Sequence, residues 1–374
     1  MGIPADQLIG MIEAAGDKPS AGDPLDGFFQ TSYDFPADGN RIRRRYRGMV
    51  ETHASRFHDP QLSIARAPGR VNLIGEHTDY NGLPVFPMAV NRDMAAVFAP
   101  RRDGKVVIAN TQQEFGERSF DIQENIAPYA AGDWGNYCKA AVWGLLDFYR
   151  KKRRPAEGLC GFQATIDGDI PIAAGMSSSS ALVVLCALIF LASNRLDLQS
   201  DADRRLELAD LLAAAERYVG TQGGGMDQTI SLMGKPGHAV RIDFFPLATR
   251  PAALPDSCAV VVANSTVRAA KSTEALDKYN RRPIECRLAA AVLKRIFSRH
   301  YDREVPISLL GDLKPEKLAL SEPAIWEIAD KALHEEPYTL EEIAGILGQS
   351  AEKTAALYCK RRDGSIFPEP ADRF

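Results

Sequence analysis

Apolar residues recur along this chain with two spacings, which separate the expected strands from the expected helices. Short apolar runs bounded by polar or turn residues predict strands, over residues 62–67, 94–98, 106–109, 162–167 and 259–263. Helical spacing of the apolar positions predicts helices, over residues 41–58, 137–151, 178–193 and 206–218. Past Arg281 the pattern is mostly helical.

This order of elements indicates an α+β fold. Strands precede helices without regular alternation, which argues against a parallel, doubly wound sheet. Residues 15–40 are rich in Gly, Pro and Asp, so we expect an extended surface segment there. The length of 374 residues suffices for two domains with sizeable cores.

Composition and charge narrow the class of protein. A hydrophobic content of 45% and a net charge of −4 are typical of a soluble globular protein, with no reason to expect nucleic acid or membrane as a partner. Basic residues cluster within 41–47 and 151–154, where we expect solvated helix ends or loops. The six cysteines show no C-x-x-C spacing, which argues against a zinc site or a disulfide scaffold. A cytoplasmic monomer is the expectation.

The segment Gly69–Gly82, GRVNLIGEHTDYNG, carries the densest candidate chemistry. It combines Arg70, Glu76, His77 and Asp79, and such groups suit the hydroxyls of a sugar, each of which both donates and accepts hydrogen bonds. A solvated turn is the alternative, because Asp, Asn and Gly are turn formers. The apolar segments on both sides favour a loop set on rigid structure, and hence a binding site.

Four consecutive serines, Ser177–Ser180, begin the apolar helix expected over 178–193. A helix N-terminus offers unpaired N–H groups and partial positive charge to an anion, and Gly175 would let the backbone approach a phosphate. A simple helix cap is the alternative, but one serine is enough for a cap. The pattern therefore favours phosphate binding, although no Gly-Lys-Ser/Thr of a Walker A loop follows.

Three successive glycines, Gly223–Gly225, precede Asp227. Glycines are costly to order, and they are typical of places where another group comes very close or where φ is positive. In isolation, a flexible turn with Asp227 as helix cap is the stronger interpretation. A functional carboxylate at the start of the next helix is the other.

Taken together, these segments resemble the galactokinases, within the small-molecule kinases of galactose, homoserine, mevalonate and phosphomevalonate (GHMP kinases). Residues 69–82 resemble the sugar-binding motif, 171–179 the motif P-x-x-x-G-(L/M)-S-S-S, and 224–228 the element G-x-M-D-Q. The resemblance implies two domains with the active site in the cleft between them. The expected division is an extended segment, an N-terminal domain and a C-terminal domain, over residues 1–40, 41–215 and 216–374.

The resemblance also implies roles for individual residues. Asp227 would orient the attacking sugar hydroxyl and accept its proton, and Arg70 would keep Asp227 ionised and neutralise the transferring phosphoryl group. The residues implied for the sugar are Arg70, Glu76, His77, Asp79, Gly225, Asp227 and Tyr279. Those implied for ATP are Ala173, Gly175, Ser177, Ser178 and Lys271, and those for Mg²⁺ are Ser178 and Glu216. At Ala173 the family often has Gly, and Tyr279 and Lys271 keep the alternative of a half-buried tyrosine and a surface lysine.

The implied function is ATP-dependent phosphorylation of galactose at its C1 hydroxyl. Two alternatives stay open: an N-acetylgalactosamine 1-kinase, which GGGMDQ and ECRLAA also resemble, and a non-catalytic sensor of sugar and ATP on the same fold. The family's third, Gly-rich motif does not follow Leu347-Gly348, so we expect an incomplete C-terminal domain. Both kinase functions require the serine-headed helix and Asp227 to lie together in one cleft.

Overall fold

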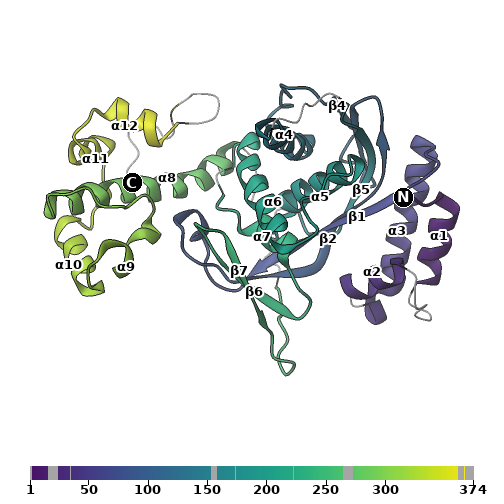
Figure 1. The fold of residues 1–374 in the computed structure, drawn as a ribbon, viewed down its shortest axis with the longest axis horizontal. Coiled ribbons are helices and arrows are strands. Elements are labelled where there is room, and N and C mark those ends of the chain that lie inside the picture. Colours follow the sequence, from purple (N-terminus) through teal and green to yellow (C-terminus); the bar gives the residue numbers. More distant parts are fainter. Residues whose placement is uncertain are drawn as a thin grey trace.

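The computed structural model describes residues 2–15, 24–33, 35–152, 158–172, 174–221, 223–263, 273–360 and 366. Its architecture is α+β, with a five-stranded sheet of order β1-β2-β5-β3-β4 (Figure 1). The strands are β1 (Ser63–Asn72), β2 (Pro87–Arg101), β3 (Lys105–Asn110), β4 (Arg118–Asp121) and β5 (Gly161–Gly168). β3 and β5 are parallel, and the other neighbours are antiparallel. Four of the five expected strands are confirmed in this sheet, and β4 was not expected.

Strand β2 shows why helices cover both faces of the sheet. Its residues 95, 97 and 99 pack with the N-terminal helices, while 94, 96 and 98 pack in the cluster on the opposite face. Successive side chains of a strand point to opposite faces. The residues on both faces of β2 are apolar here, because each face is covered by helices. The N-terminal helices are α1 (Ala5–Ala14), α2 (Pro24–Ser32) and α3 (Phe35–Phe57), and the opposite face carries α4 (Gly135–Lys151) and α5 (Ser178–Ser193).

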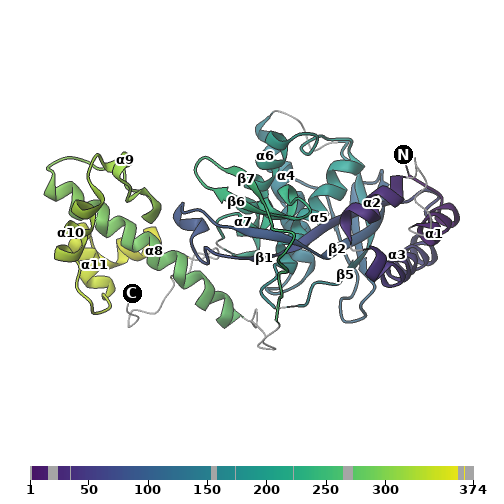
Figure 2. The same ribbon diagram turned by 90° about the horizontal axis from the view of Figure 1, so that it is seen from below.

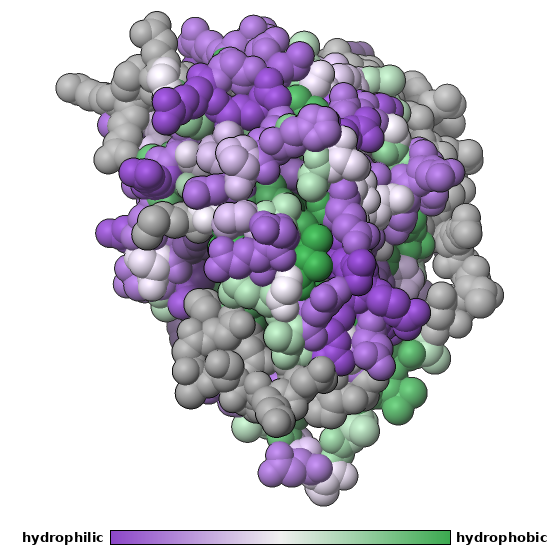
Figure 3. Space-filling view, turned by 90° about the vertical axis from the view of Figure 1, so that its right-hand side faces the viewer, coloured by the Kyte–Doolittle hydropathy of each residue, from purple (hydrophilic) through white to green (hydrophobic). Residues whose placement is uncertain are grey.

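Most of the described residues up to 40 are helical, so the extended segment expected over 15–40, and over 1–40 as a whole, is wrong for residues 5–14, 24–32 and 35–40. Leu8, Ile12 and Phe29 are at most 2% exposed and pack against the sheet. Pro24 opens α2, at a position where the missing proline N–H costs nothing. Figure 3 views the molecule from this side, where hydrophilic residues are prominent and apolar areas are small. The apolar faces of the helices are therefore turned inward.

Residues after α5 complete the body of the molecule, by which we mean α1 to β7. They form α6 (Ala202–Ala215), the short 3-10 helix η2 (Glu216–Val219), α7 (Met226–Met233) and the antiparallel pair β6 (His238–Asp243) and β7 (Ala248–Ala253). The strand expected over 259–263 is wrong, since these residues have no regular structure and Val261 is 88% exposed. Strand propensity depends on packing against neighbouring strands, and the run of valines does not supply that context.

A helical lobe, formed by α8 to α12, lies beside the body (Figures 1 and 2). Its helices are α8 (Thr273–His300), α9 (Pro315–Leu318), α10 (Glu322–Ala332), α11 (Leu340–Leu347) and α12 (Ala351–Tyr358). Two apolar clusters pack around α8, one centred on Phe297 and the other on Leu288. The division at residues 215 and 216 stays a prediction. Within the described ranges, no helix has the length and apolar character needed to cross a bilayer.

Candidate active site

A cleft of about 2380 Å³ is lined both by the body and by α8. It collects the segments that the sequence singled out, although they lie far apart along the chain. From the body come residues of the loop 70–81, of the serine segment 174–180 and of the stretch 216–229. From the helical lobe come residues 280–287, together with Leu309 and residues near the end of α12.

Arg70 enters this cleft from a break in the pairing of β1. The register between β1 and β2 shifts between Pro68 and Arg70, which marks a bulge or irregularity that can re-aim a side chain. A Cβ on Gly69 would lie 2.9 Å from the Met176 carbonyl oxygen, so only glycine allows this approach to the serine segment. The Arg70 N–H then donates to the same carbonyl at 3.3 Å.

Asp227 lies at the start of α7, where three side chains meet it. Arg70 Nε donates to Asp227 Oδ1 at 2.7 Å. Ser177 Oγ donates to Asp227 Oδ2, and Ser180 Oγ lies 3.5 Å from the same oxygen. The carboxylate stays about a quarter exposed. The serine-headed helix and Asp227 therefore lie together, as the sequence analysis requires.

The glycine triplet serves a different purpose at each position. A Cβ on Gly224 would lie 2.3 Å from the Tyr80 backbone nitrogen, whereas one on Gly223 would meet nothing within 4 Å. Gly225 has φ of +104° and caps α7. The close approach lets the Gly224 N–H donate to Asp79 Oδ2 at 3.0 Å. Burial, and then the charge of Asp227, raise the pKa of Asp79.

The remaining polar groups of the loop face the cleft. Glu76 and His77 are exposed there, and His77 Nδ1 lies 2.8 Å from the Tyr80 hydroxyl. Asn81 Nδ2 donates to the His77 carbonyl at 3.0 Å and to Cys286 Sγ of α8 at 3.3 Å. The loop is thus tied both to itself and to the helical lobe.

The serine helix meets a buried carboxylate across the cleft. Ser178, Ser179 and Glu216 all line the cleft, although Glu216 is only 6% exposed. Tyr137 connects the two sides: its hydroxyl hydrogen-bonds Ser179, and burial followed by the charge of Glu216 raises the pKa of Tyr137. In the part of the chain that the structure describes, no group of three or more His, Cys, Asp or Glu side chains could hold a metal ion.

Some expected site residues lie outside the described residues. Ala173 and Lys271 do, and so does the side chain of Tyr279, whose backbone belongs to α8. Gly175 lines the cleft, and its carbonyl accepts a hydrogen bond from Arg70. Sequence reasoning did not single out Ser180, nor Asn280, which donates to the Gly220 carbonyl at 2.9 Å. It expected Tyr137 to serve in packing rather than in the site. Of these three residues, only Ser180 had a signal in the sequence, which was its place in the run of four serines.

The cleft joins the N-terminus of a serine-headed helix to a carboxylate and an arginine, a combination that suits phosphoryl transfer. The model of the GHMP kinases N terminal domain matches residues 136–235, and the galactokinase galactose-binding signature matches residues 51–100. Residues 136–235 thus match the N-terminal domain of the GHMP kinases, and the preceding residues 51–100 match a galactokinase signature.

Individual relatives carry the name galactokinase. The chain is 33% identical over 330 residues to the galactokinase of Dictyostelium discoideum, which covers 84% of this chain and 62% of the relative. It is 40% identical over 283 residues to that of Roseiflexus sp. (strain RS-1), which covers 75% of this chain and 64% of the relative. The crystal structure of Lactococcus lactis galactokinase complexed with galactose matches with a TM-score of 0.56 and 29% identity, over 76% of this chain and 70% of that one. The chain thus spans less than two thirds of these two curated relatives.

Proposed function

We propose that this chain phosphorylates galactose at the C1 hydroxyl with ATP, which gives galactose 1-phosphate and ADP. The observation that carries the proposal is the contact of Arg70 and Ser177 with the two oxygens of Asp227. It brings the sugar loop, the serine helix and a partly exposed carboxylate to one point. In the reaction the C1 oxygen forms a bond to the γ-phosphorus, the bond from that phosphorus to the ADP oxygen breaks, and the hydroxyl proton passes to Asp227.

The sugar would lie against the loop 76–80 and the start of α7. Glu76 and His77 are exposed to the cleft, and Asp79 is held in place by the Gly224 N–H. Carboxylates accept from sugar hydroxyls, and an imidazole can do either. Gly225 and Tyr279 belong to the same proposed sugar site, and Arg70 would offset charge on the transferring group.

ATP would place its phosphates at the N-terminus of α5, where Gly175, Ser177 and Ser178 line the cleft. Ala173 and Lys271 are proposed as further contacts. The donor set also suits Mg²⁺, because Ser178 would offer a hydroxyl oxygen and Glu216 a carboxylate, and Mg²⁺ is bound through oxygen ligands. Bound there, Mg²⁺ would neutralise charge on the phosphates.

Two other functions fit the same site. An N-acetylgalactosamine 1-kinase would use the same groups on a larger sugar. A sensor would bind both ligands without transfer, but the contacts that Asp227 makes with Arg70 and with the serine helix favour catalysis.

An ADP-release assay with galactose and N-acetylgalactosamine in parallel tests the proposal. Asp227→Asn should lower turnover by about 10²- to 10⁴-fold, while calorimetry still detects sugar binding. Asp256→Asn, which changes an exposed carboxylate in a turn, is the control and should keep full turnover. Binding of both ligands without ADP release by the parent chain would support the sensor instead.

A further inference from the structure

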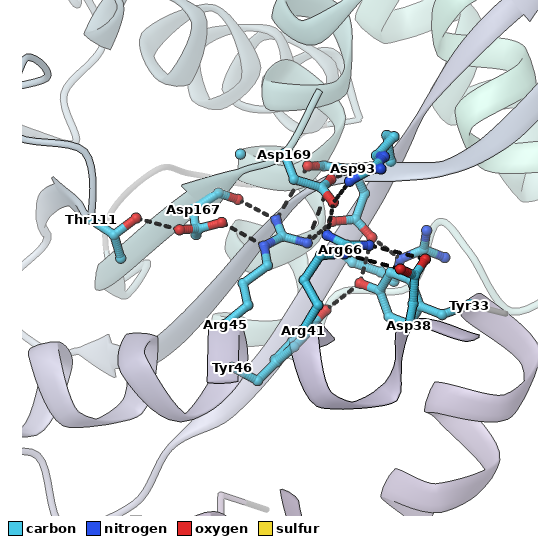
Figure 4. A network of polar contacts seen from close by, with 12 residues as sticks. Tyr33, Asp38, Arg41, Arg45, Tyr46, Arg66, Asp93, Thr111, Asp167 and Asp169 are labelled. Atoms are coloured by element: carbon cyan, nitrogen blue, oxygen red, sulfur yellow. Dashed lines mark hydrogen bonds and ion pairs between the residues drawn. The ribbon is translucent and has the colours of Figure 1, made fainter. Parts of the chain in front are cut away.

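A network of arginine and aspartate side chains lies between α3 and the sheet, on the face away from α5 (Figure 4). Arg45 is only 7% exposed, and its Nη1 lies 2.7 Å from Asp93 Oδ1. Arg66 Nε lies 2.6 Å from the other oxygen of Asp93, which the Tyr33 hydroxyl also contacts at 2.5 Å. The expectation of solvated helix residues over 41–47 is therefore wrong for Arg45.

Asp169 connects the network to the chain that leads into the serine segment. This residue follows β5 directly and precedes Ile170, which lines the cleft. The Asp93 N–H donates to Asp169 Oδ1 at 2.7 Å, and the Asp169 N–H donates to the Asp93 carbonyl at 3.0 Å. Arg41 Nη1 donates to Asp169 Oδ2 at 2.7 Å, and Arg92 approaches the same oxygen at 3.3 Å. Both the main chain and the side chain of Asp169 are thus fixed.

The chain is consequently held both at Asp169, which precedes the serine segment, and within that segment. Arg41 and Asp93 fix Asp169. Within the segment Arg70 donates to the carbonyls of Gly175 and Met176. Ile170 and Ile172, directly after Asp169, line the cleft, so a shift at Asp169 would displace backbone that faces it.

The surrounding charges keep the Asp169 carboxylate ionised. Although burial acts against it, the charge of Arg45, the Asp93 N–H and Arg41 together lower the pKa of Asp169, so the carboxylate is stabilised in its ionised form. Charge-assisted hydrogen bonds to guanidinium groups fix geometry as well as energy. Desolvation offsets much of the attraction in buried ion pairs, so the position that the network imposes matters more than its net free energy.

We infer that Arg41 is a positioning residue for nucleotide binding: through Asp169, it holds residues 170–172 and the serine segment that follows them at the place where the phosphates of ATP would bind. This inference rests on the proposed function, since it assigns the phosphates to that segment. Arg41 lies on α3, outside the cleft, and its side chain is 34% exposed. Its loss should therefore leave the fold intact.

The test compares Arg41→Met with Arg44→Met, which changes an exposed arginine of the same helix that donates to the Asn40 carbonyl. Calorimetry measures ATP and galactose binding separately, and steady-state assays give KM for each substrate and kcat. Arg41→Met should weaken ATP binding and raise KM for ATP by about fivefold, since one of several charge-assisted hydrogen bonds to Asp169 is lost. In Arg41→Met, galactose binding and kcat should stay at the parent values. Arg44→Met should match the parent in every measurement, and Arg41→Lys should recover part of the lost ATP binding.

Two further results decide the inference. Arg92→Met removes another donor to the same oxygen from a side chain that is 42% exposed, so it should give a smaller change in the same direction, whether or not Arg41→Met folds. Unchanged ATP binding in the Arg41 and Arg92 variants, or equal weakening of ATP and galactose, would overturn the inference alone. Failure of the parent chain to bind ATP would overturn it together with the proposed function.

Discussion

The two clusters of charged residues in this molecule are built on opposite principles. In the network beneath α3, Arg45 and Arg66 flank a fully buried Asp93, and Asp169 meets Arg41. In the cleft, Asp79 is held by backbone N–H groups, and burial together with the charge of another carboxylate, Asp227, raises its pKa. The first cluster has its charges balanced by its own side chains, while the second leaves a carboxylate in an unfavourable environment.

This difference separates structural from functional groups. A paired carboxylate is favoured in its charged form by the fold itself, as the lowered pKa of Asp169 indicates. A carboxylate whose pKa is raised by burial and by a like charge, as at Asp79, carries a cost that a ligand can relieve. Such groups cluster at binding and catalytic sites. Substitutions in each cluster test this distinction: those in the network should affect mainly stability, and those in the cleft mainly ligand binding.

The largest effect on stability should come from Asp93→Ala. The side chain of Asp93 is 0% exposed, and its removal leaves Arg45 and Arg66 without their shared partner. Breaking a buried pair in this way costs about 3–5 kcal/mol, which denaturant unfolding measures. Asp103→Ala is the control: Asp103 pairs with Arg101 at the surface and is 51% exposed, so about 1 kcal/mol or less is expected. Equal losses would show that the network is no more structural than a surface pair.

A smaller effect should follow from Gly224→Ala in the cleft. The new methyl group would meet the backbone of Asp79 and Tyr80, which must shift at a cost of about 1–3 kcal/mol. Galactose binding should weaken more than thermal stability falls, because the displaced loop is the proposed sugar site. Gly223→Ala, whose methyl group would meet nothing within 4 Å, should bind galactose like the parent. A loss in both variants would point to loop flexibility rather than close packing.

The parts of this comparison that were predictable from sequence are those with a local signal. The serine run and the apolar period predicted a helix over 178–193, which is α5 as observed. The glycine triplet predicted a close approach or a positive φ, and Gly224 and Gly225 show one each. These features depend on backbone constraints that a few neighbouring residues determine.

The network beneath α3 left no such signal. Arg45 is separated from Asp93 by 48 residues and from Asp167 by 122. Its position in a basic run is typical of a solvated helix face, and nothing local indicates that the sheet supplies the partners. Helices α1 and α2 were missed for a related reason. The Gly, Pro and Asp content of this part of the chain indicates loops, while the stability of these helices comes from packing with α3 and β2.

The smallest expected effect is a difference in how the free energy of unfolding depends on pH in two variants, Asp79→Asn and Asp169→Asn. The folded-state pKa of Asp169 is lowered, so its contribution is present above the unfolded value, about 3.9, and is lost as pH falls through the folded pKa. The folded-state pKa of Asp79 is raised, so its contribution is present below that value and is lost as pH rises through the folded pKa. At neutral pH the asparagine should therefore destabilise at position 169 and stabilise at position 79, by on the order of 1 kcal/mol each. The difference at position 79 should shrink as unfolding is measured toward pH 4. The difference at position 169 should persist to about pH 4 and shrink only at lower pH. The same sign at both positions would remove the distinction between the two clusters.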